Sequence, residues 1–274
     1  YPVAIEHGAG FDPWRIGEAA AAAVRRAWDR TEGSVLAFLP GVAEIRRTAE
    51  ALGPWSAPVL ELYGDLPPAR QDAVLGTSER RVILATNVAE TSVTVPGVTA
   101  VVDTGLAKVL RHDLGRGMNR LVPEPISRAS AEQRAGRAGR ERPGMCLRLW
   151  PEADHRLRRA YDEPEIHRIS LAGAALQLLA WGESDLDAFP WFDRPAPAAL
   201  TQALDLLREL GAVGPQGLTD VGRQMAQVAT EPRLARLVVA GAEFGVPRDA
   251  ALAAAILGER DPFGRNGPAR ASHS

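Results

Sequence analysis

Short runs of apolar, β-branched residues alternate with helical patterns through the first 150 residues of this 274-residue chain. The runs typical of buried strands lie at 34–39, 58–63, 81–85, 98–103 and 144–150. Helical patterns follow the first two runs, over 41–52 and from Pro67-Pro68 onward, where proline is tolerated in a first turn. Strands that alternate with helices form parallel sheets, and continuous apolar runs indicate strands covered on both faces. The alternation therefore predicts an α/β layer sandwich.

Beyond Trp150 the pattern becomes helical. Helices are expected over 170–181, 198–211, 220–228, 231–244 and 247–257. Gly182 ends the first of these helices, and Gly211 stands where a left-handed C-cap would close the second. The stretch "AVGPQGLT" between the second and third helix is short enough for a small hairpin wing, so the order resembles a winged-helix module.

Composition excludes several classes of protein. One cysteine, Cys146, rules out a disulfide framework, and the five histidines have no ligand spacing, so no metal site is expected. No apolar run reaches the eighteen or so residues that a membrane span needs, and no signal peptide is recognisable. We expect a cytoplasmic protein without a membrane partner. The absence of an initiating Met favours a piece of a longer protein.

Charge is distributed unevenly along the chain. Between Leu106 and Arg148 there are ten Lys or Arg residues and four Asp or Glu residues, so this stretch carries +6 within a chain of net charge −2. A basic block inside an acidic chain indicates contact with a polyanion, and a solvated helix face is the alternative. Two β-like runs around "DLGRG" in the same stretch predict a hairpin over about 106–122.

The segment "SAEQRAGRAGR" (130–140) carries the strongest chemical signal. Ser130 and Gln133 fit a capping box, so a helix is expected to begin at Ser130. At 100° per residue, Gln133, Arg137 and Arg140 then fall on one stripe. Two glycines, at 136 and 139, would let another surface approach closely. Because guanidinium groups match oxyanions in geometry, the stripe predicts phosphate recognition; an exposed basic helix is the plain alternative, and Gln133 could simply complete the cap.

A second polar segment, "ATNVAETSVTVPG" (85–97), follows a predicted buried strand. Ligands bind at loops after the carboxyl ends of strands in α/β sheets. The segment is rich in small hydroxyl and amide side chains, which contact phosphate and ribose without reading bases; they are Thr86, Asn87, Thr91, Ser92 and Thr94. An ordinary turn with a helix cap would favour the same residue types.

Together these segments resemble the second RecA-like domain of the DEAH-box family of RNA helicases. "QRAGRAGR" resembles motif VI of that family, "LATNVAETSVTVPGVTAVVDTGL" motif V, and "VLAFLPGVAEI" motif IV. Downstream, "EPEIHRISLAGAALQLLAWG" and "LTDVGRQMAQVATEPRLARLV" resemble the winged-helix and helical-bundle regions of the bacterial HrpB branch. The resemblance implies an α/β RecA-like parallel-sheet domain followed by an all-α, winged-helix region.

The resemblance also implies domain limits. The second RecA-like domain would span 1–152, and a linker with the winged helix 153–229. A truncated helical bundle would begin over 230–260. Residues 261–274 would form a disordered tail.

Several functional roles follow from the resemblance alone. Arg137 and Arg140 would contact the γ-phosphate of ATP, with Arg140 as arginine finger, and Gln133 would help to place the attacking water. Thr86 and Asn87 would hold the RNA backbone, while Ser92 and Thr94 would lie towards the nucleotide. Single-stranded RNA, with DNA as the other candidate, and the first RecA-like domain of the same protein would be the partners.

Two departures from the family pattern concern the nucleotide. Pro96 stands where the family often has a ribose-binding acid, and Leu75 replaces a base-stacking aromatic residue. A larger absence concerns catalysis, because neither G-x-x-x-x-G-K-[ST] nor D-E-x-H occurs. ATP with Mg²⁺ would therefore be bound mainly by a first RecA-like domain outside this sequence, and the isolated chain is expected to be inactive. The alternative is a non-catalytic nucleic-acid-binding or adaptor module with a degenerate RecA-like domain.

Overall fold

The structure is a computed structural model that describes residues 1–77, 79–91, 93–113 and 118–258. It divides into two compact units, Tyr1–Leu110 with Arg120–Glu163, and Arg111–Asn119 with Pro164–Ser274. The stretch 261–274, predicted to be a tail, lies outside the described residues. Each unit is described by itself.

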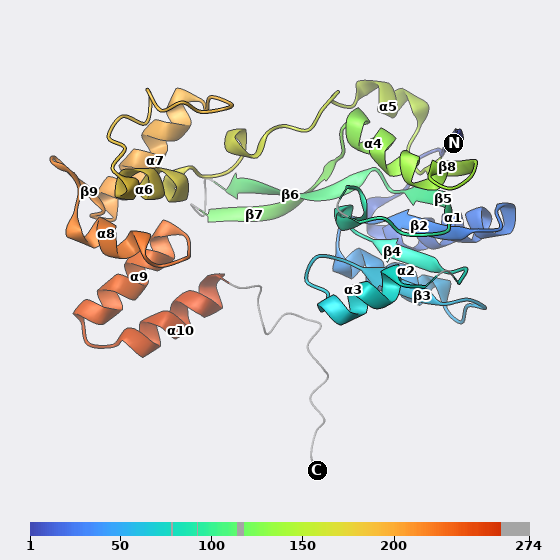
Figure 1. Cartoon of the computed structure of the whole chain (residues 1–274), viewed down its shortest axis with the longest axis horizontal. Helices are drawn as coiled ribbons and strands as arrows, with labels where there is room; N and C mark the ends of the chain where they lie inside the picture. The colour runs from blue at the N-terminus through green and yellow to red at the C-terminus, as the bar shows by residue number, and fades with distance from the viewer. Residues whose placement is uncertain (78, 92, 114–117, 259–274) are drawn as a thin grey trace, which may run out of the picture. The chain divides into compact units, whose positions relative to one another are not determined.

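The N-terminal unit is built on a six-stranded sheet in the order β1-β8-β5-β2-β4-β3, in which every pairing is parallel (Figure 1). The strands are β1 (Val3–His7), β2 (Ser34–Phe38), β3 (Val59–Leu62), β4 (Val82–Ala85), β5 (Val98–Asp103) and β8 (Gly144–Arg148). The parallel sheet and its five apolar strands confirm the sequence prediction, while β1 was not predicted.

Helices cover both faces of this sheet, as the continuous apolar strands require. One face packs against α1 (Ile16–Arg30) and α2 (Val42–Leu52) through side chains such as Val35 and Ala37. The other face, with Leu36 and Phe38, packs against α3 (Pro68–Leu75), α4 (Arg128–Ala135) and the 3₁₀ turn η3 (Gly136–Gly139). Neighbours in sequence thus point into opposite cores, because side chains alternate along a strand. The sequence prediction missed α1.

The strand register brings the segments that follow β2, β4 and β5 to one edge of the sheet. Phe38, the last residue of β2, pairs with Ala85 of β4 on one side and with Asp103 of β5 on the other. The chain therefore leaves these three strands at neighbouring points along the carboxyl edge. The short elements after β4 and β8 are η2 (Asn87–Ala89) and α5 (Glu152–Leu157), and η1 (Pro13–Arg15) precedes α1.

A hairpin of β6 (Leu106–Asp113) and β7 (Met118–Pro125) follows β5. It matches the predicted hairpin, with the second strand extending three residues beyond the predicted end. Residues 114–117 of its turn lie outside the described residues.

The C-terminal unit is mainly helical and has its own core. Its elements are η4 (Glu165–His167), α6 (Ala172–Trp181), α7 (Pro197–Glu209), β9 (Val213–Gly214), β10 (Gly217–Leu218), α8 (Asp220–Ala226), α9 (Pro232–Glu243) and α10 (Pro247–Gly258). Leu176, Leu207 and Met225 are buried together in that core. Gly211 adopts a φ of 73°, which confirms the predicted left-handed cap. The helix α6 ends before Gly182 as predicted, and Gly182 has a φ of 105°. The assignment to a winged helix and the start of a helical bundle stays a prediction.

No helix in the described part of the chain is both long and apolar enough to cross a membrane.

Candidate active site

The segment that holds the predicted arginines begins earlier than expected. The helix α4 starts at Arg128, and its N-cap is Ser127, whose Oγ accepts a hydrogen bond from the amide of Ser130 at 3.1 Å. The first free amides of the helix donate to backbone carbonyls elsewhere in the unit, from Arg128 to Arg159 and from Ala129 to Ala160. The predicted capping box at Ser130 is therefore wrong, because a long-range backbone contact and Ser127 supply the cap.

Ser130 has a different partner. Its side chain is buried, and its hydroxyl donates to Oε1 of Glu90 at 2.7 Å. Glu90 lies directly after η2, in the second polar segment of the sequence. The two segments that the sequence singled out are therefore joined by a partly buried side-chain contact.

The predicted stripe of Gln133, Arg137 and Arg140 lines one pocket. This pocket has a volume of about 300 Å³, and Glu90, Thr91 and Gly136 complete its lining. The α-helix ends at Ala135 and continues as the 3₁₀ turn η3, which leaves Arg137 buried and Gln133 and Arg140 exposed. The structure thus brings the three side chains together, although they do not lie on one uniform helix.

Uncharged oxygens of the second polar segment hold both arginines of the pocket. Arg137 donates through Nη1 to the carbonyl of Val93 at 2.7 Å and through Nη2 to the carbonyl of Glu90. Arg140 donates to the hydroxyl of Thr94. Burial lowers the pKa of Arg137, and the nearby charge of Arg140 lowers it further. An arginine still stays protonated near neutral pH, so the pocket presents two cations.

The glycines of the segment have two different surroundings. A Cβ on Gly136 would meet no atom within 4 Å, so the pocket is open on that side. A Cβ on Gly139 would lie 2.6 Å from the carbonyl oxygen of Tyr1 and 2.7 Å from Cγ2 of Val3. Close approach to Gly139 therefore serves the packing of the chain's own N-terminal strand, whereas Gly136 leaves room for an external group.

Thr86 and Asn87 lie outside this pocket. They follow β4 at the carboxyl edge of the sheet, where the amide of Thr86 donates to the carbonyl of Leu62 at 3.1 Å. Asn87 is exposed, and its carbonyl accepts from the amide of Glu90 at 2.9 Å. Thr94 is also exposed and contacts Arg140, while Ser92 lies outside the described residues.

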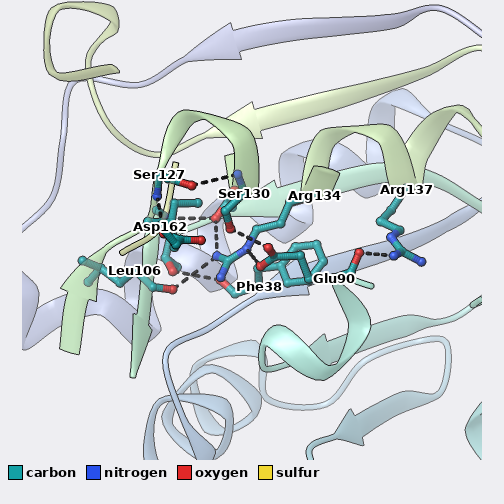
Figure 2. Close-up of polar contacts among 12 residues, drawn as sticks. Phe38, Glu90, Leu106, Ser127, Ser130, Arg134, Arg137 and Asp162 are labelled. Atoms are coloured by element: carbon teal, nitrogen blue, oxygen red, sulfur yellow. Dashed lines mark hydrogen bonds and ion pairs between the residues drawn. The ribbon is translucent and has the colours of Figure 1, made fainter. Parts of the chain in front are cut away.

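Sequence reasoning missed the buried ion pairs behind the pocket. Arg134 is only 1% exposed and pairs with Glu90 at 2.8 Å and with Asp103 at 3.0 Å. Figure 2 shows its guanidinium group pointing away from Arg137, into a cluster with Phe38 and Leu106. The only local signal was the position of Asp103 at a strand end, which fits a cap. Its Oδ1 does accept from the amide of Gly105 at 2.8 Å, in addition to the ion pair.

The described residues hold no group of three or more His, Cys, Asp or Glu side chains that could bind a metal ion. The pocket itself presents two guanidinium groups, those of Arg137 and Arg140. It suits an anionic group that approaches from the open side of Gly136 and replaces uncharged oxygens as the partner of two guanidinium groups.

Comparisons with known proteins identify relatives of this chain. Residues 19–142 match the family described as the helicase conserved C-terminal domain. The ATP-dependent RNA helicase HrpA of Escherichia coli is 41% identical over 242 residues, which cover 85% of this chain and 19% of that protein. HrpB of the same species is 40% identical over 258 residues, covering 92% of this chain and 32% of that protein.

A solved structure of the Escherichia coli DEAH/RHA helicase HrpB has a TM-score of 0.89 and 36% identity, covering 98% of this chain and 36% of that one. The chain thus spans between about a fifth and a third of the length of these relatives.

Proposed function

The chain contains the C-terminal helicase domain found in DEAH-type RNA helicases, and from this premise we propose that it supplies half of an ATP-hydrolysing site in a longer RNA helicase. The observation that carries the proposal is the pocket with two guanidinium groups, Arg137 and Arg140, whose described partners are uncharged oxygens. Among the described residues neither guanidinium group forms an ion pair, and a triphosphate supplies the anionic partner.

Each side chain of the stripe has a proposed role. Arg140 is exposed at the rim of the pocket and acts as the arginine finger, which stabilises the charge that develops on the transferred phosphoryl group. Arg137 is held in place by two backbone carbonyls and binds the γ-phosphate from the buried side. Gln133, exposed beside them, orients the attacking water with its amide group.

Contacts with nucleotide and RNA are assigned to the second polar segment. Thr94 lies towards the nucleotide, which its contact with Arg140 supports, and Ser92 is proposed for the same role on sequence grounds alone. Thr86 and Asn87 hold the backbone of single-stranded RNA or DNA; their position at the carboxyl edge of the sheet, together with the exposure of Asn87, supports this role.

The site is completed by another domain of the same protein. The sequence has no phosphate-binding loop and no D-E-x-H, so the cradle for the phosphates and the ligands of Mg²⁺ belong to a first RecA-like domain. The isolated chain is therefore expected to hydrolyse ATP only at background rate. RNA-stimulated hydrolysis by the purified chain alone would contradict this part of the proposal.

The experiment is steady-state ATP hydrolysis by the full-length protein with saturating single-stranded RNA. Arg140→Ala is expected to reduce turnover on the order of 10³-fold or more, as removal of an arginine finger does. Arg137→Ala should also reduce turnover, because it removes the buried phosphate contact. The matched control is Arg142→Ala, since Arg142 is an exposed arginine two residues farther along that does not line the pocket.

Turnover of Arg140→Ala within a few-fold of wild type would exclude the arginine-finger assignment. A wild-type protein that binds RNA but does not hydrolyse ATP would favour the adaptor alternative instead.

A further inference from the structure

Arg134 touches three separate parts of the N-terminal unit. Its Nε donates to Oε2 of Glu90 at 2.8 Å, and its Nη1 donates to Oδ1 of Asp103 at 3.0 Å and to the carbonyl of Leu106 at 3.2 Å (Figure 2). These partners belong to the loop after β4, the end of β5 and the start of β6. One buried guanidinium group therefore joins the pocket wall to the base of the hairpin.

On the pocket side, Glu90 links Arg134 to Arg137. The carboxylate of Glu90 accepts from Arg134 and from Ser130, while the carbonyl of Glu90 accepts from Arg137. A displacement of Glu90 thus displaces an acceptor that holds Arg137 in the pocket. The position of the phosphate-binding arginine and the position of Arg134 are linked through this residue.

On the hairpin side, Arg134 contacts the hinge from which the hairpin leaves the sheet. Asp103 accepts from the amide of Gly105, which has a φ of 74°. The carbonyl of Gly105 accepts from the amide of Ile126 at 3.0 Å, and Arg158 donates to the carbonyls of both. Hydrogen bonds therefore fasten the two strands to each other where the first begins and the second ends, and they join this hairpin base to Asp103.

The far end of the hairpin belongs to the other unit. Residues 111–113 and 118–119 group with the C-terminal helices, and within that unit the amide of His112 donates to the carbonyl of Arg168 at 2.8 Å. Asn119 accepts from the amide of Ser170 at 2.9 Å. The hairpin thus leads from the neighbourhood of Arg134 into the second compact unit.

Stability alone does not account for this arrangement. Replacing a buried ion pair by well-packed apolar residues is often neutral or stabilising, so three polar partners on one buried cation are weak evidence for a stabilising role. The planar fork of arginine, in contrast, fixes the relative directions of its partners. The ring of Phe38, whose centroid lies 4.8 Å from the guanidinium carbon, restricts the group further.

We propose that Arg134 is a positioning residue that couples the nucleotide pocket to the hairpin. A group bound by Arg137 and Arg140 biases Glu90, and Arg134 transmits that bias to Asp103 and Leu106 at the hairpin base. RNA or the C-terminal unit, acting on the hairpin, biases the arginines of the pocket in return, because coupling between two sites is reciprocal. The inference rests on the proposed function of the pocket.

The test compares two lysine variants of the full-length protein. Arg134→Lys keeps the charge but cannot reach Glu90, Asp103 and Leu106 together. Arg148→Lys is the matched control, because Arg148 is also buried, at 2% exposed, and pairs with a carboxylate at 2.8 Å, that of Glu132. The measured quantity is the ratio of ATP turnover with saturating single-stranded RNA to turnover without RNA, with the melting temperature recorded for each variant.

The coupling predicts that Arg134→Lys lowers this ratio on the order of tenfold, whereas Arg148→Lys keeps the wild-type ratio. A wild-type ratio in Arg134→Lys would overturn the inference, whatever its melting temperature, because a purely structural residue changes stability without changing the ratio. If Arg134→Lys does not fold, Asp103→Asn is read in the same way, since it removes the negative charge that is paired with Arg134 while its amide oxygen can still accept from Gly105. A wild-type protein without RNA-stimulated turnover would instead overturn the proposed function, and the coupling with it.

Discussion

The buried and open sides of the segment Arg128–Arg140 both carry arginine residues, in different surroundings. On the buried side, Ser130 and Arg134 have charged partners on Glu90 and Asp103. On the open side, Gln133 and Gly136 line a pocket with nothing close to the space beside Gly136. One short segment thus provides both a buried network of polar contacts and the lining of a pocket.

The difference between the two sides is the counter-charge that each arginine finds. Desolvation on its own lowers the pKa of Arg134, but attraction to Asp103 and Glu90 outweighs it and raises that pKa. Desolvation also acts on Arg137, where the charge of Arg140 adds to it and lowers the pKa. A paired arginine holds its neighbours in place, whereas an arginine beside another cation favours an incoming anion. The partners, and not the residue type, therefore assign the role.

The largest expected effect is a difference in stability between a variant of Arg134, on the buried side, and a variant of Arg140, on the open side. Arg134→Met leaves Asp103, which is fully buried, and Glu90 without their cation, and breaking a buried pair in this way costs about 3–5 kcal/mol. Arg140→Met removes an exposed side chain and should change stability by no more than about 0.5 kcal/mol. Urea unfolding of the full-length protein, followed by circular dichroism, measures both. Equal losses of unfolding free energy in the two variants would contradict the distinction between a structural Arg134 and an exposed Arg140.

A smaller effect uses the two glycines. Gly139→Ala places a methyl group 2.6 Å from the backbone oxygen of Tyr1, and we expect overpacking to cost about 1–3 kcal/mol. Gly136 has a helical φ of −57° and open space around it, so Gly136→Ala should gain up to about 1 kcal/mol. The same methyl group would narrow the pocket and raise the KM for ATP. Unfolding midpoints and KM values of both variants test these two predictions. A Gly136→Ala variant that is less stable than the wild type would show that the space beside Gly136 is not open.

The smallest expected effect is a pH dependence of stability that arises from His155, beside Arg148. Burial lowers the pKa of His155, and the charge of Arg148, which is 3.3 Å away and paired with Glu132 of α4, lowers it further. The folded protein therefore binds a proton at His155 less readily than the unfolded chain does. Stability should fall as the pH drops below about 6.5, the ordinary histidine pKa. In His155→Gln this loss between pH 7.5 and 5.5 should be smaller; an unchanged loss would assign it to other groups.

Much of the fold follows from local sequence signals, and the exceptions have physical causes. The central strands are apolar at every position because both faces are covered, which makes them recognisable. The edge strand β1 has exposed residues in its middle, so it lacks a continuous apolar run. The helix α1 begins without a side-chain cap, although its buried residues follow a helical spacing. The cap of α4 was misplaced because its first amides bond to Arg159 and Ala160, about thirty residues away in sequence.

The candidate site was predictable only where it is local. Spacing alone placed Gln133, Arg137 and Arg140 together, and the structure brings them to one pocket. The contacts of Arg134 with Glu90 and Asp103 join residues 44 and 31 positions apart. No short-range sequence pattern marks such pairs, so the contacts of Arg134 can be identified only in the folded chain.

The central claim is that Arg140 acts in ATP turnover whereas Arg134 holds the structure around it. Its most direct test measures ATP turnover and melting temperature on the same full-length samples of Arg140→Lys and Arg134→Lys. The account predicts that Arg140→Lys melts with the wild type and loses most of its turnover, because an ammonium group cannot replace the guanidinium fork. It predicts that Arg134→Lys melts at a lower temperature and loses RNA stimulation in particular. A stable Arg134→Lys with wild-type RNA stimulation, beside an Arg140→Lys that turns over ATP normally, would contradict the account.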